Sequence, residues 1–72
     1  MPPELLRQIG EALWGLSWQS AMARELGVSD RTVRRWAAGK FCPPDGIAVR
    51  LGEILAARQN ALGGLRKAVA AL

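Results

Sequence analysis

The chain has 72 residues, enough for one domain, and half of them are hydrophobic, which argues against disorder. Its net charge of +4 favours an anionic partner, either nucleic acid or an anionic membrane surface. Histidine is absent, and neither a carboxylate pair nor a glycine-rich phosphate loop has catalytic spacing. We therefore expect no enzyme, no metal, no cofactor and no small-molecule ligand.

The single cysteine, Cys42, cannot form an internal disulfide and favours a reducing compartment. We expect it to be a small packing residue. The first residues lack the basic region of a signal peptide, and no apolar run approaches the ~18 residues of a membrane span. These features predict a cytoplasmic protein that does not enter a membrane.

Abundant Leu and Ala, with few β-branched residues, predict an all-α fold, a compact domain of four to five helices. The apolar spacing and the glycines predict these helices: Pro3–Trp14, Trp18–Leu26, Asp30–Ala38, one from Pro44 or Asp45 to Ala57 or Arg58, and Ala61–Leu72. Ser17 and Ser29 are the expected N-caps of the second and third helices. Gly63 and Gly64 predict a break between Gln59 and Gly64.

The second and third predicted helices are short and joined by a tight turn, which is the pattern of a helix-turn-helix. Ala23 is small where the two helices would cross, and Gly27 permits the positive φ that the turn needs. Val28 is the apolar residue that follows the turn. At 100° per residue, Val33 and Trp36 share one face and are expected to fix the third helix against the core.

Positive charge gathers on the other side of the third helix. Residues 24–40 contain five positive and two negative side chains, a net charge of +3. Arg31 and Arg35 face away from the core residues, and Thr32 and Arg34 flank them. Such a helix can be merely a solvated face, but arginine also fits guanine edges and phosphates.

The segment SWQSAMARELGVSDRTVRRWAAGKFCPP resembles the helix-turn-helix of the Cro/repressor (Xre-like) family, and the likeness extends over roughly residues 5–55. It has the glutamine that opens the second helix, an alanine four residues later, Gly-Val-Ser at the turn, and glycine and proline after the third helix. The resemblance implies base readout by Arg31, Arg35 and Thr32. It implies DNA-backbone contacts by Gln19, Ser29, Arg34 and Lys40. Asp30 departs from the pattern, and we expect it to cap the helix, to orient Arg31 or to accept from a cytosine.

The resemblance implies a sequence-specific regulator that binds double-stranded DNA, of the small (auto)repressor type that phages and other mobile elements encode. The alternative is a helix-turn-helix that binds protein, as an adaptor or as the antitoxin half of a pair. DNA binding that weakens steeply with salt would favour the first interpretation.

A stripe of apolar residues at heptad spacing, interrupted once by arginine, runs through the C-terminal part: Leu51, Leu55, Arg58, Leu62, Leu65, Val69 and Leu72. We expect residues 1–58 to form the DNA-binding domain and residues 59–72 a segment for homodimerisation. The expected dimer contacts are Leu55, Leu62, Leu65, Val69 and Leu72. The alternative is that this segment folds back on its own domain. A dimer would hold two third helices about 34 Å apart and select an inverted repeat.

Overall fold

The computed structural model describes all 72 residues, and its regular elements are all helices, without strands. Four α-helices follow one another: α1 (Pro3–Trp14), α2 (Trp18–Leu26), α3 (Asp30–Ala37) and α4 (Asp45–Ala70). A 3₁₀ turn, η1 (Gly15–Ser17), joins α1 to α2. The bounds of α1 and α2 are those predicted, and α3 ends one residue earlier than expected.

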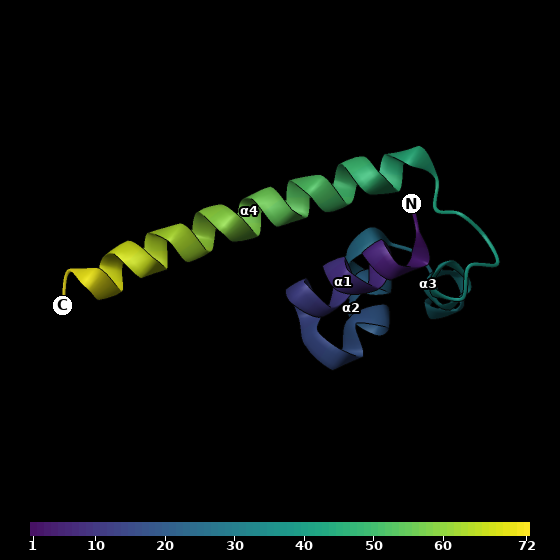
Figure 1. Ribbon diagram of the computed structural model, residues 1–72, viewed down its shortest axis with the longest axis horizontal. Coiled ribbons are helices and arrows are strands. Elements are labelled where there is room, and N and C mark those ends of the chain that lie inside the picture. The colour runs from purple at the N-terminus through teal and green to yellow at the C-terminus, as the bar shows by residue number, and fades with distance from the viewer.

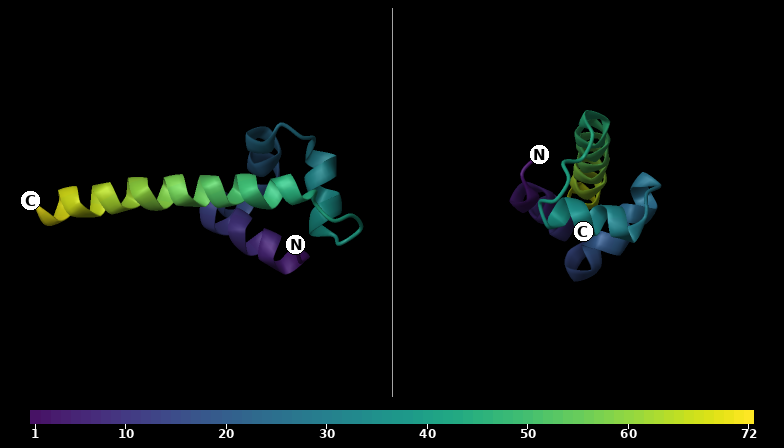
Figure 2. Two further views of the ribbon diagram at one scale, coloured as in Figure 1. Left: turned by 90° about the horizontal axis from the view of Figure 1, so that it is seen from above. Right: turned by 90° about the vertical axis from the view of Figure 1, so that its right-hand side faces the viewer.

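The three short helices α1, α2 and α3 pack against one another, and we call them the three-helix body. Helix α4 crosses this body with its first half and then projects away from it as a rod (Figures 1 and 2). The molecule is therefore elongated, with extents of 48 × 23 × 21 Å. The all-α prediction is confirmed, but the prediction of a compact domain of four to five helices is wrong, because only α1, α2 and α3 pack fully together and α4 joins them with part of its first half alone.

The core of the body draws on every helix, and its members are Leu6, Trp18, Met22, Ala23, Val33, Trp36 and Leu51. Leu51 is the only fully buried residue of α4, and Ile47 and Ile54 flank it against the core. The predicted core positions Ala23, Val33 and Trp36 are confirmed. Because α4 contacts the core only through this short apolar stretch, its residues beyond 55 make few contacts with the body.

Helices α1 and α2 approach closely at Gly10, which is buried against the Trp18 ring. A Cβ added at Gly10 would overlap three atoms of that ring, so only glycine fits. Gly15 then ends α1 with a φ of +77°, which glycine adopts without strain. The predicted cap at Ser17 is wrong, because η1 continues the chain directly into α2 and the Ser17 side chain makes no capping bond.

Helix α4 runs unbroken for 26 residues, so the predicted break between Gln59 and Gly64 is wrong. Gly63 and Gly64 each cost about 1 kcal/mol relative to alanine, but glycine has its N–H and adopts helical angles freely. Leucine, alanine, arginine and lysine surround the pair, and no proline interrupts residues 45–72. Although α4 is long, none of the helices is apolar enough over a sufficient length to cross a membrane.

The outer face of α1 carries a small ionic cluster in which Arg7 donates to both Glu4 and Glu11. The hydrogen bond from Arg7 lowers the pKa of Glu4, and the two carboxylates raise the pKa of Arg7. Both groups are exposed, so the cluster supports α1 locally and does not form a site.

Candidate nucleic-acid interface

The connection from α2 to α3 is a short turn that has the positive φ at Gly27 and the apolar Val28 predicted from the sequence. Gly27 has a φ of +72°, and its N–H donates to the Arg24 carbonyl at 3.4 Å. The N–H of Val28 donates to the Ala23 carbonyl at 3.0 Å, which completes a Schellman motif, and Val28 packs against the core. The turn therefore fixes where α3 starts relative to α2.

Helix α3 begins with two further polar anchors. The Ser29 Oγ accepts from the Thr32 N–H at 3.1 Å and lies 2.9 Å from the Thr32 hydroxyl, so the predicted N-cap is confirmed. The Ser20 hydroxyl of α2 donates to the Asp30 carboxylate at 3.0 Å. Asp30 thus links α3 to α2; the cap is Ser29 and no ion pair joins Asp30 to Arg31, while acceptance from a cytosine stays a prediction.

The two sides of α3 differ in burial and charge. Val33 and Trp36 are buried, whereas Arg31 and Arg34 are exposed and Arg35 is half-buried. No ion pair involves these three arginines, since all ion pairs of the chain lie on α1 and α4. Three unpaired guanidinium groups on one short helix form a positive surface without an internal partner.

Arg35 makes a contact with the loop after α3 that the sequence analysis did not predict. The Arg35 Cζ lies 5.4 Å from the centre of the exposed Phe41 ring, within cation–π range. The two residues border a pocket of about 400 Å³ together with Val28, Thr32, Trp36, Cys42 and Pro44. An aromatic residue six positions after an outward-facing arginine is the signal that could have identified the pair.

The remaining predicted contact residues lie around the ends of α2 and α3. Gln19 is half-buried in the first turn of α2, and Ser29 is exposed at the turn. Lys40 is exposed just after α3, and its N–H donates to the Arg35 carbonyl at 3.0 Å. Helix α3 lies at the opposite end of the molecule from the C-terminus, so the rod does not cover its surface (Figure 1).

Cys42 lies in the loop from Gly39 to Pro44, and the prediction that it is a packing residue is wrong. Its thiol is exposed rather than packed, because a positive φ of +76° at Gly39 and two successive prolines carry the chain around the body. No group of three or more His, Cys, Asp and Glu side chains is close enough to hold a metal ion.

Comparison of the chain with protein-family models, with curated proteins and with solved structures finds no match.

Proposed function

We propose that this protein is a sequence-specific DNA-binding transcriptional repressor in which α2 and α3 form a helix-turn-helix and α3 enters the major groove. The observation that carries the proposal is the arrangement of α3. Its apolar side chains Val33 and Trp36 hold it against the core, and its three arginines lie on the other side with no ion-pair partner in the chain.

Each exposed group has a role in this proposal. Arg31 and Arg35 donate to guanine edges, and Thr32 offers its methyl group to a thymine because its hydroxyl lies against that of Ser29. The groups that contact phosphates are Gln19, Ser29, Arg34 and Lys40. Since a single body reads only one half-site, we include homodimerisation through α4 in the proposal, which makes the target an inverted repeat.

Selection of random duplex fragments by the purified protein, followed by sequencing, tests the proposal. A recurring inverted repeat is expected, bound with an affinity that falls linearly on a log–log plot against salt concentration. Arg31→Ala should relax the selected preference at one or two base pairs. Arg50→Ala is the matched control, because it removes the same charge from α4, where Arg50 faces Glu53 at 3.8 Å.

Failure to enrich any fragment, together with no salt-dependent binding to duplex DNA, would overturn the proposal. The protein-binding interpretation would then be the better account of the α2–α3 unit.

A further inference from the structure

The outer half of α4 carries an apolar stripe that nothing in the chain covers. Leu62, Leu65 and Val69 are 56%, 63% and 67% exposed. The stripe lies on the same side of the helix as Ile47, Leu51 and Ile54, which pack on the body. One continuous face of α4 is therefore buried against the body in its first turns and exposed to solvent beyond residue 55.

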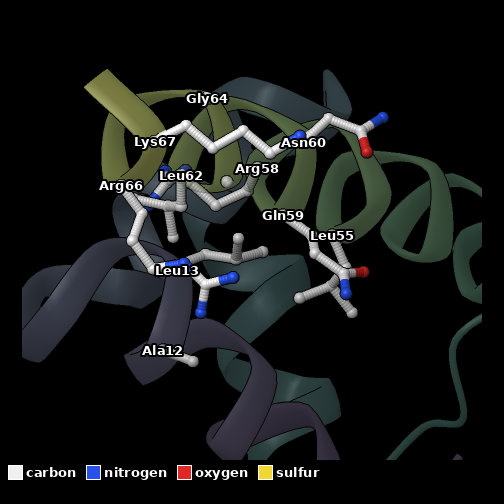
Figure 3. A pocket seen from close by; sticks show the side chains of 11 residues that line it. Ala12, Leu13, Leu55, Arg58, Gln59, Asn60, Leu62, Gly64, Arg66 and Lys67 are labelled. Atoms are coloured by element: carbon white, nitrogen blue, oxygen red, sulfur yellow. The ribbon is translucent and has the colours of Figure 1, made fainter. Parts of the chain in front are cut away.

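A groove of about 770 Å³ lies where the bare part of the stripe leaves the body. Ala12 and Leu13 of α1 line one side of the groove, and residues of α4 between Leu55 and Lys67 line the other side. In Figure 3, Leu13 lies opposite Leu62 and Arg66, while Lys67 and Asn60 point away from α1. The groove is thus apolar at its base and basic at its rim.

Two observations disfavour a second copy running parallel along this stripe. A parallel partner helix would have to continue over residues 47–54, where the same face is already covered by the body. It would also place Arg58 beside the partner's Arg58, since the two share one layer of the heptad pattern. No acidic residue follows Glu53 to neutralise that pair.

An antiparallel partner avoids both difficulties. The stripe is symmetric about the Gly63–Gly64 bond, so Leu62 would face the partner's Leu65, and Leu55 the partner's Leu72. The two Arg58 side chains would be about 16 Å apart along the axis, beyond the ~8 Å screening length at physiological salt. Each Arg58 would instead lie beside the partner's Val69, in the last turn of a helix whose end carbonyls favour a positive charge.

We propose that residues 55–72 of two copies pair antiparallel, with the last turn of each α4 seated in the groove between α1 and α4 of the other copy. This deepens the homodimer of the proposed function without depending on DNA. Its consequence for the molecule is that the two bodies lie at opposite ends of a paired rod. At 1.5 Å per residue, the two α4 N-termini are then about 55 Å apart, so this pairing does not keep the one-turn spacing of ~34 Å expected from the sequence, and the half-sites of the inverted repeat would be further apart.

The single native cysteine provides the test. Cys42 is exposed and lies three residues before α4, so it can carry a nitroxide spin label in the intact chain without a new cysteine. Pulsed dipolar spectroscopy at tens of micromolar protein, without DNA, should give a main distance of roughly 50–60 Å. A main distance below about 35 Å, as parallel pairing at 8–10 Å between axes would give, overturns the proposal.

Two variants complete the experiment. Leu65→Glu places a charge in the stripe, outside the core of the body, and should abolish the dipolar signal and give a monomer in sedimentation. Ala56→Glu, on the opposite side of α4, should keep both the distance and the dimer. A monomeric parent chain, or equal behaviour of the two variants, would overturn the proposal while leaving the DNA-selection experiment to be decided separately.

Discussion

Among the outward-facing arginines of α3, only Arg35 has an aromatic neighbour. The Phe41 ring limits the directions that its guanidinium can take, whereas Arg31 and Arg34 extend into solvent. A long side chain that is ordered before binding loses less conformational entropy when it meets a base. At the scale of single residues, the loop after α3 is thus part of the proposed interface.

Arg31→Ala and Arg35→Ala should each weaken binding to the selected DNA by about 1–3 kcal/mol and relax the preference at one or two base pairs. Competition assays against the selected duplex and a scrambled duplex measure both effects, and Arg50→Ala controls for charge. If one variant weakened binding to both duplexes equally, that arginine would be a phosphate contact.

Phe41→Leu should lower discrimination at the base pair that Arg35 reads, by about 0.5–1 kcal/mol, because the cation–π contact is lost while apolar bulk remains. Phe41→Trp keeps a ring and should restore discrimination. The same Leu substitution made in an Arg35→Ala background should have no further effect, and an undiminished effect there would disprove the coupling.

At the scale of helices, the sequence predicted the short elements well and the long one badly. Gly15, Gly27 and the Ser29 cap are local signals, so the bounds of α1 and α2 and the start of α3 followed from them. The continuity of α4 could not be predicted from Gly63 and Gly64, because a local cost of ~1 kcal/mol each competes with the cooperativity of a long helix.

Contacts between different segments of the chain were the second feature that could not be predicted from the sequence. The Arg35–Phe41 pair and the Ser20–Asp30 bond join residues that no periodicity relates. The fit of Trp18 on Gly10 likewise depends on how α1 crosses α2, so these contacts could not be predicted from the sequence, and the side chains of the DNA interface stay a prediction.

Gly10→Ala should destabilise the body by about 1–3 kcal/mol, because the added methyl group overlaps the Trp18 ring in a packed core. Gly52→Ala is the matched control, since open space surrounds Gly52 on the exposed side of α4, and it should stabilise the helix by about 0.5–1 kcal/mol. Thermal unfolding followed by circular dichroism measures both. A Gly10→Ala chain as stable as the parent would show that α1 and α2 can separate without cost.

At the scale of the whole molecule, stability is unevenly distributed along α4. Residues 47–54 are held by the core, whereas residues 55–70 form a bare helix of a length that is marginal in water when isolated. Gly63 and Gly64 lower its stability further, by about 1 kcal/mol each. The body and the outer rod are thus expected to unfold separately when no second copy is present.

Helical content at 222 nm should therefore fall when the protein is diluted from tens of micromolar to well below the dimer dissociation constant, while tryptophan fluorescence from the body stays unchanged. Leu65→Glu should show the lower helical content at every concentration, and Ala56→Glu should follow the parent chain. Helical content independent of concentration would mean that the outer rod is stable alone.

If the outer part of α4 folds only on dimerisation, the concentration of the protein itself would control its binding to DNA. At low concentration the protein would be a monomer with an unfolded C-terminal segment, which binds one half-site weakly and dissociates fast. As synthesis proceeds, folding and pairing would rise together with the square of concentration, so occupancy of the operator would switch on over a narrow range of doses. Such a repressor would respond to its own concentration without a small-molecule ligand, because folding of the outer part of α4 depends on that concentration.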